Sequence, residues 1–128
     1  GTITPYLNAP AQVVRFRMLN GSSMRSYDFG FSNNMLFYQI ASDGGLLAAP
    51  IPLTRVRLAP GERAEILADL QTMEGESIQL KSFSSELPDG IYGAAAVGNG
   101  MVSIPEYDLN PLNGADYNIL QISSYRSF

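Results

Sequence analysis

Two pairs of carboxylates are the first residues in this sequence that could perform acid–base chemistry. Glu62 and Glu65 lie at the start of one predicted strand, and Glu74 and Glu76 flank a turn glycine. General acid–base catalysis requires a carboxyl pKa that a cleft has shifted. Glu65 lies on the polar face of its strand and the second pair lies at a turn, so we interpret all four as solvated surface groups.

Metal and nucleophile chemistry is limited by two residue types that the sequence lacks. The 128 residues include no histidine and no cysteine. A Ser–His or Cys–His nucleophile therefore cannot form, and neither can a disulfide or a zinc–thiolate site. A blue copper site needs two histidines and a cysteine. The five methionines are scattered, and we interpret them as core filling. We predict no catalytic, cofactor-binding or metal-ligating residue in this chain.

Two short polar motifs have a structural interpretation beside a functional one. Asp43-Gly44-Gly45 could suggest an oxygen-rich cation site, but one carboxylate is too few for calcium. We predict a turn in which Asp43 caps backbone N–H groups while Gly44 or Gly45 takes a positive φ. Asn20-Gly21-Ser22 fits a glycosylation acceptor. It also occupies a turn that the fold needs, and we favour that role.

Short strands are the elements that must position these residues. Apolar residues alternate with Arg15 and Arg17 over 13–19, and with Glu65 and Asp69 over 62–70. Similar segments at 26–32, 36–41, 53–59, 78–83 and 117–122, with turns between them, predict an antiparallel β-sandwich. The predicted core is formed by the inward-facing members of this alternation: Val14, Phe16, Phe29, Ile40, Val56, Leu58, Ile66 and Leu80.

The remaining segments are predicted to be irregular. Residues 1–12 are expected to be extended and turn-like, and Pro50 and Pro52 exclude a central strand around Ile51. Residues from about 84 to 116 are rich in Gly, Ala, Ser, Pro and Asn. So long a loop is uncommon in a compact domain and is often functional or interfacial.

Length and charge exclude several classes of protein. A chain of 128 residues has the size of one domain. The net charge is −4 and no basic stripe is present, which argues against a nucleic-acid partner. No run of about 20 apolar residues predicts a membrane span.

Three stretches, in this order and spacing, resemble one known family. They are Arg15 to Ser22 with Arg25, Asp43 to Leu47, and Leu58 to Arg63 followed by Leu67 and Asp69. The chain resembles the middle, second cupredoxin-like domain of a bacterial three-domain multicopper oxidase of the laccase or cuprous oxidase type. The family pattern has R-F-R-L-L-N-G-S, D-G-G-L-L and L-A-P-G-E-R, so Met18 is a departure. The resemblance covers roughly residues 1–70, and its motif residues are Arg17, Asn20, Gly21, Arg25, Asp43, Gly44, Gly45, Pro60, Gly61, Glu62, Arg63 and Asp69.

The resemblance implies a Greek-key β-sandwich of cupredoxin type that holds no copper itself. Residues 1–128 would form one central domain, and the opening Gly1 to Leu7 resembles the crossover from the first domain. Copper would lie in other domains of a parent chain that oxidises phenols or metal ions and reduces dioxygen to water. The flanking cupredoxin domains would be the partners. Arg25, Glu62 and Arg63 are expected to form ion pairs that pin turns or face such a domain.

Three further expectations follow from the same resemblance. The parent would be periplasmic, secreted or at the cell surface. The excised domain would self-associate through apolar area exposed around 91–102. Some relatives keep the three-domain fold without copper and act in the envelope or in cell division, so a non-enzymatic parent is the alternative to an oxidase.

A free-standing sugar- or protein-binding sandwich is disfavoured because the chain lacks tryptophan and opens on a domain-crossover motif.

Overall fold

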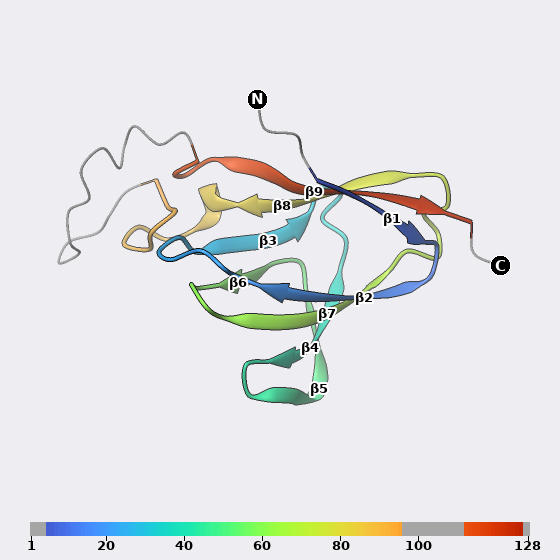
Figure 1. Ribbon diagram of the computed structural model, residues 1–128, viewed down its shortest axis with the longest axis horizontal. Helices are drawn as coiled ribbons and strands as arrows, with labels where there is room; N and C mark the ends of the chain where they lie inside the picture. Colours follow the sequence, from blue (N-terminus) through green and yellow to red (C-terminus); the bar gives the residue numbers. More distant parts are fainter. Residues whose placement is uncertain (1–4, 96–111, 127–128) are drawn as a thin grey trace.

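The fold consists of short strands in two packed layers (Figure 1). The computed structural model describes residues 5–95 and 112–126. Within these ranges the elements are β1 Tyr6–Pro10, β2 Val13–Leu19, β3 Tyr27–Phe31, β4 Phe37–Ser42, β5 Gly45–Leu53, β6 Val56–Leu58, β7 Arg63–Asp69, β8 Ser77–Phe83, the single-turn helix η1 Ser84–Glu86 and β9 Asp116–Tyr125. No helix in the described ranges is long and apolar enough to cross a membrane.

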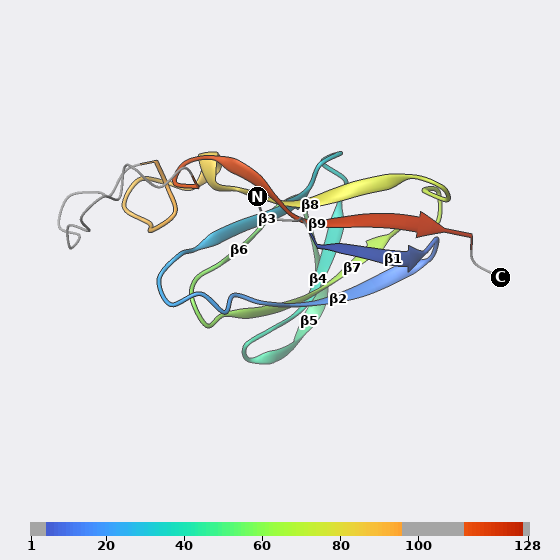
Figure 2. The same cartoon turned by 45° about the horizontal axis from the view of Figure 1, so that its top comes forward.

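The strands form two sheets whose order shows repeated crossing between layers. One sheet has the order β1-β9-β8-β3-β6 and the other has the order β2-β7-β4-β5. Figure 2 shows β3, β8 and β9 in one layer with β2 and β7 in the other. All pairs of neighbours are antiparallel except β1 and β9, which are parallel. The chain is therefore an all-β Greek-key sandwich, as the sequence predicts.

The core lies between the two sheets and is centred on aromatic residues. Phe31 is fully buried, and its ring centroid lies 6.3 Å from that of Phe16 and 5.7 Å from that of Phe37. Val14 and Phe16 are partly buried and pack against this core. Five of the eight predicted core residues are buried: Phe29, Val56, Leu58, Ile66 and Leu80.

Ile40 is the predicted core residue that the structure places elsewhere. The pairing of β4 with both neighbours shifts register between Gln39 and Ala41, so Ile40 lies at an irregularity of the ladder. Such a bulge interrupts the period-two alternation on which the prediction rests. Ile40 is only partly buried, and it is not among the residues that pack against the core.

Strand β3 is buried on both faces, although alternation predicts one polar side. Asp28 is only 5% exposed, and its backbone N–H donates to Ser82 Oγ over 3.2 Å. Burial raises the pKa of Asp28 above its ordinary value, and the nearby Arg57 opposes this shift. On the same side of the strand, a Cβ on Gly30 would lie 2.8 Å from the backbone carbonyl oxygen of Thr54, so the close approach of this carbonyl requires glycine.

The sequence prediction missed two strands, and one predicted irregular segment lies partly outside the described residues. Residues 6–10 form β1 and 45–53 form β5, which is an edge strand and therefore tolerates Pro50 and Pro52. The predicted irregular segment 84–116 contains η1 in its described part. Its residues 96–111 lie outside the described residues, as does most of the apolar area expected around 91–102. Within the described part of that area, Ala94 is fully buried.

Candidate functional site

Asn20 is the residue at which the motif turns meet. It follows β2 and is 1% exposed. Its Nδ2 donates to Arg25 O over 2.7 Å and to Leu58 O over 2.9 Å, and its Oδ1 accepts from the Ser22 N–H over 3.0 Å. Because both side-chain protons are already donated to carbonyls inside the fold, the Asn20-Gly21-Ser22 sequence forms a structural turn here.

The Pro60-Gly61 turn is held against Asn20 and connects the two sheets. Gly61 has a φ of 81°, and the Glu62 N–H donates to Ala59 O over 3.0 Å, which closes a β-turn. Glu62 Oε1 accepts in return from the Ala59 N–H over 2.6 Å. The backbone of Asn20 donates to Glu62 O over 3.0 Å and accepts from Gly61 N over 2.8 Å. This turn leads from β6 in one sheet to β7 in the other, so it fixes the layers relative to each other.

Asp43 caps a backbone group far from its own turn, which corrects the sequence prediction. Its Oδ1 accepts from the Arg63 N–H over 2.9 Å, 20 residues along the chain. The local cap is supplied instead by Ser42 Oγ, which accepts weakly from the Gly44 N–H over 3.4 Å. Gly45 has a φ of 104°, which confirms the predicted positive φ at one of the two glycines.

The expected ion pairs of Arg25, Glu62 and Arg63 are absent from the described part of the chain. Its three ion pairs are Arg15–Glu65 at 3.2 Å, Arg17–Glu65 at 2.8 Å and Arg55–Glu86 at 3.1 Å. The Glu62 carboxylate is instead bound by a backbone N–H, and Arg25 contributes its carbonyl to Asn20. For Glu62 the physical reason is the Ala59 N–H, which lies 2.6 Å from its carboxylate.

Most of the motif residues therefore lie at one end of the sandwich. This end contains the segment after β2, the turn between β6 and β7, and the turn between β4 and β5. Asp69 is the exception, because it ends β7 at the opposite end, where its Oδ1 accepts from the Gln71 N–H over 2.9 Å. Asp69 thus terminates a strand and takes no part in the motif cluster.

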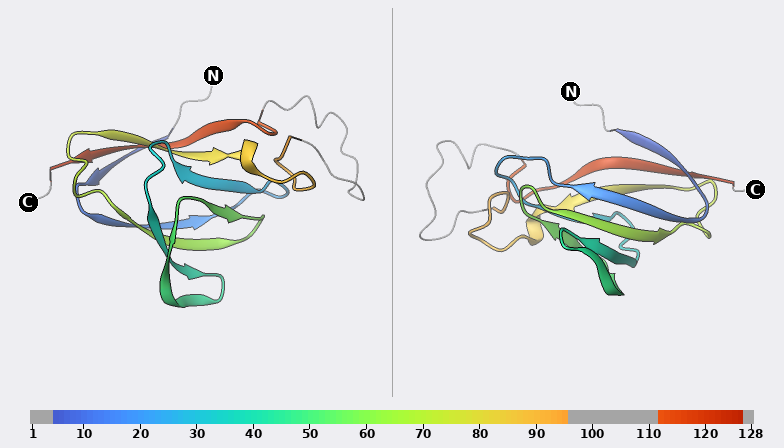
Figure 3. Two further views of the ribbon diagram at one scale, coloured as in Figure 1. Left: turned by 180° about the vertical axis from the view of Figure 1, so that it is seen from behind. Right: turned by 60° about the horizontal axis from the view of Figure 1, so that its bottom comes forward.

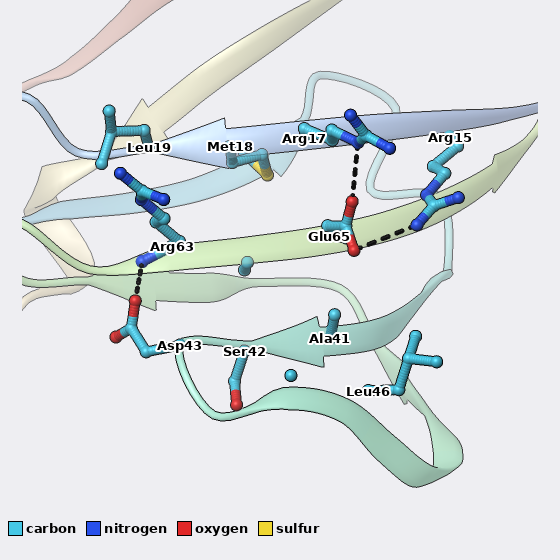
Figure 4. A pocket seen from close by; sticks show the side chains of 12 residues that line it. Arg15, Arg17, Met18, Leu19, Ala41, Ser42, Asp43, Leu46, Arg63 and Glu65 are labelled. Atoms are coloured by element: carbon cyan, nitrogen blue, oxygen red, sulfur yellow. Dashed lines mark hydrogen bonds and ion pairs between the residues drawn. The ribbon is translucent and has the colours of Figure 1, made fainter.

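A pocket of about 590 Å³ lies beside this cluster, on the outward face of the four-stranded sheet (Figure 4). The hairpin of β4 and β5 forms the edge of the four-stranded sheet and protrudes at the bottom of the left view in Figure 3. Residues of this hairpin line the pocket on one side. Figure 4 places Leu46 of β5 across from Arg15 and Arg17 of β2. The pocket is lined by Arg15, Arg17, Met18, Leu19, Ala41, Ser42, Asp43, Gly45, Leu46, Arg63, Ala64 and Glu65.

The charged groups of this pocket pair with one another and are not suited to proton transfer. Glu65 accepts from Arg17 Nε over 2.8 Å and from Arg15 Nη2 over 3.2 Å. The hydrogen bond from Arg15 is the main cause that lowers the pKa of Glu65 below its ordinary value. A carboxylate held ionised in this way is a poor general base near neutral pH.

The residues present do not fit a copper site of the blue type. That site needs imidazole and thiolate ligands, and the sequence contains neither side chain. Among the residues that the structure describes, no three or more Asp or Glu side chains gather to hold a metal ion. No step of copper chemistry can therefore be assigned to residues of this chain.

Sequence reasoning did not find the partnership of Arg15 with Glu65 or the exposed Leu46 of the pocket. The alternation placed Arg15, Arg17 and Glu65 on polar strand faces, but pairing them needs the register of two strands about 50 residues apart. In the structure Arg17 lies directly opposite Glu65 across β2 and β7. The opposite charges on the two predicted strands are the signal that could have suggested the pair.

Comparisons with known proteins agree on one family. No family model matches the chain. It is 46% identical over 80 residues to a multicopper oxidase of Staphylococcus epidermidis, and 44% identical over 80 residues to a laccase of Bacillus subtilis. It is 39% identical over 80 residues to the cell division protein FtsP of a Rahnella species. Each alignment covers 62% of this chain but only 16–18% of the relative, so the chain spans less than a fifth of the length of these proteins.

Solved structures extend the similarity over nearly the whole chain. The McoA multicopper oxidase of Aquifex aeolicus matches with a TM-score of 0.71 and 25% identity, over 95% of this chain and 23% of that one. The laccase-like multicopper oxidase CueO of an Ochrobactrum species matches with a TM-score of 0.70 and 25% identity, over 98% and 22%. The fold is thus that of the cupredoxin-like β-sandwiches. The chain is a cupredoxin-like domain of the multicopper oxidase family.

Proposed function

We propose that this chain is the copper-free central domain of a multicopper oxidase that oxidises phenols or metal ions and reduces dioxygen to water. The observation that carries the proposal is a contrast between the fold and the side chains of the sequence. The chain has the fold of copper oxidases, yet its 128 residues offer no histidine or cysteine for copper. In such a parent the ligands lie in other domains, and the relatives are about six times as long as the aligned part.

The role of the domain in that parent is to hold its neighbours in register. The hydrogen bonds around Asn20 fix the turn that joins the two sheets, which gives the domain a rigid end. The outward face of the four-stranded sheet also carries apolar side chains that water covers in the isolated chain. Outside the pocket residues of this face, Val13 is 49% exposed and Tyr38 42%. Burial of such residues against a flanking domain would stabilise the parent by roughly 25 cal/mol for each Å².

The same proposal covers the organisation and location of the protein. Residues 1–128 form one domain whose partners are the flanking cupredoxin domains of its own chain. The parent acts in the periplasm, outside the cell or at its surface. Self-association of the isolated domain is expected where the missing neighbours leave apolar area exposed.

A second candidate is supported by the FtsP relatives. The chain is 39% identical to one of these cell division proteins and 44% identical to that of Histophilus somni, values close to those for the oxidases. In this candidate the parent keeps the three-domain fold, binds no copper and has no oxidase activity. The two candidates share the same structure for residues 1–128, so the difference lies outside this chain.

The parent reading frame on either side of this sequence distinguishes the two candidates. The oxidase predicts paired His-x-His motifs before this domain and a His-Cys-His run near the end of the parent. Flanks without these motifs would overturn the oxidase and support the cell-division candidate. A reading frame that ends at both borders of this chain would overturn both candidates, because neither can function as this domain alone.

A further inference from the structure

The pocket beside the motif cluster carries a positive charge surplus on a negatively charged protein. Three guanidinium groups line it, from Arg15, Arg17 and Arg63, against the two carboxylates of Asp43 and Glu65. Three positive and two negative charges leave a surplus of one, whereas the whole chain has a net charge of −4. An anion that approaches this protein is therefore attracted to this face and repelled by most of the rest.

Several donors of these arginines remain available to a ligand. A guanidinium has five N–H donors in a planar fork. In their hydrogen bonds to Glu65, Arg15 donates from Nη2 and Arg17 donates from Nε. Arg63 takes part in none of the three ion pairs within the described residues, and the Arg17 side chain is 77% exposed. A planar carboxylate matches this fork in a bidentate manner, which a lysine pocket would not provide.

The walls of the pocket add an apolar component to this charge. Leu46 is 77% exposed and Leu19 is 56% exposed, and both line the pocket. Ala41 of β4 is 5% exposed and also lines the pocket. The volume of about 590 Å³ lies in the range of roughly 300–1,000 Å³ that is usual for small-ligand pockets.

We propose that this pocket is a binding site for a carboxylate carried on an apolar body. The carboxylate lies against Arg63 and Arg17, and the apolar body covers Leu46 and Leu19. The proposal goes beyond the role of the domain in a parent oxidase and does not depend on copper. The carboxylate can belong to a free organic acid or to an acidic side chain of a peptide segment, because both present the same group.

A titration of the ¹⁵N-labelled 128-residue chain with 3-phenylpropionate tests this chemistry by NMR. We expect saturable amide shifts confined to the strand residues around the pocket, with a dissociation constant on the order of 1 mM for so small a ligand. The matched amide, 3-phenylpropionamide, and inorganic phosphate each lack one of the two features, so each should bind about tenfold more weakly. Absence of saturation at roughly ten times that concentration, or equal shifts with the amide, would overturn the proposal.

Variants locate the site and identify the source of the carboxylate. Arg63→Gln and Arg17→Gln should each weaken the binding of 3-phenylpropionate about five- to tenfold. Leu46→Ser should weaken the binding of 3-phenylpropionate but leave the binding of phosphate unchanged. Arg126 directly follows β9, a strand of the other sheet, and does not line the pocket, so Arg126→Gln serves as the matched control that leaves binding unchanged. Unchanged binding in Arg63→Gln and Arg17→Gln would overturn the site.

A peptide distinguishes the two sources of the carboxylate. Tighter binding of acetyl-Leu-Asp-Leu-amide than of the free acid would identify an acidic segment as the source. Tighter binding of the free acid would identify a free organic acid.

Discussion

Replacement of Asn20 by alanine should be among the most destabilising single changes in this chain. The substitution removes three hydrogen bonds of a side chain that is 1% exposed, and it leaves Arg25 O, Leu58 O and the Ser22 N–H without that partner. Each bond contributes about 0.5–1.5 kcal/mol net. The expected loss is therefore about 3 kcal/mol, a large share of the roughly 5–15 kcal/mol that stabilise a domain.

Urea denaturation followed by circular dichroism measures this loss, provided that the slope with denaturant stays unchanged. Asn118→Ala is the matched control, because Asn118 is an exposed asparagine on β9, and such a surface change should stay within about 0.5 kcal/mol. Asn20→Asp distinguishes the effect of side-chain size from the effect of hydrogen-bond donation. It keeps the size of the side chain but replaces the Nδ2 donor group by an oxygen that can only accept. It should destabilise at least as much as Asn20→Ala at neutral pH. A loss below 1 kcal/mol for both variants would refute the role assigned to Asn20.

The remaining predictions concern a turn, a buried carboxyl and the core. Gly45→Ala should cost more than about 1 kcal/mol, because its φ of 104° strains a side chain, whereas Gly44→Ala should cost less in the same melts. Burial raises the pKa of Asp28, so its ionisation destabilises the folded state as pH rises through the ordinary carboxyl value. Asp28→Asn should therefore have a larger free energy of unfolding than wild type at pH 7. Below about pH 4, urea denaturation should show no difference between the two proteins. Phe16→Ala should lose about 3 kcal/mol, the low end for a buried aromatic because Phe16 is only partly buried; an unchanged midpoint would contradict its packing against Phe31.

The parts of the fold that sequence alone predicted are those set by local patterning. Alternation of Val14, Phe16 and Met18 with two arginines predicted a strand over 13–19, which is β2 to the residue. The Pro60-Gly61 turn and a positive φ in the 44–45 pair were also predicted, because only certain residues tolerate these backbone angles. Local rules suffice for such features because the deciding interactions lie within a few residues.

The parts that sequence did not predict depend on partners distant in the chain. β1 is a strand because it pairs in parallel with β9, more than a hundred residues later. The carboxylate of Asp43 caps the N–H of Arg63, and Glu65 joins two arginines of β2, since the sheets bring these residues together. Ile40 was misplaced for the same reason, because the bulge beside it is a property of pairing and not of the strand sequence.

Measured copper content decides whether this chain is a copper-free domain of a copper-containing oxidase. The 128-residue chain and its full-length parent would each be loaded with Cu(II), dialysed and assayed for bound copper, blue-copper absorption and phenol oxidation. Because this chain offers neither imidazole nor thiolate, we expect background copper and no oxidation for the chain, with copper and activity in the parent. Stoichiometric blue copper on the chain alone, or a parent without copper and without oxidase activity, would contradict it.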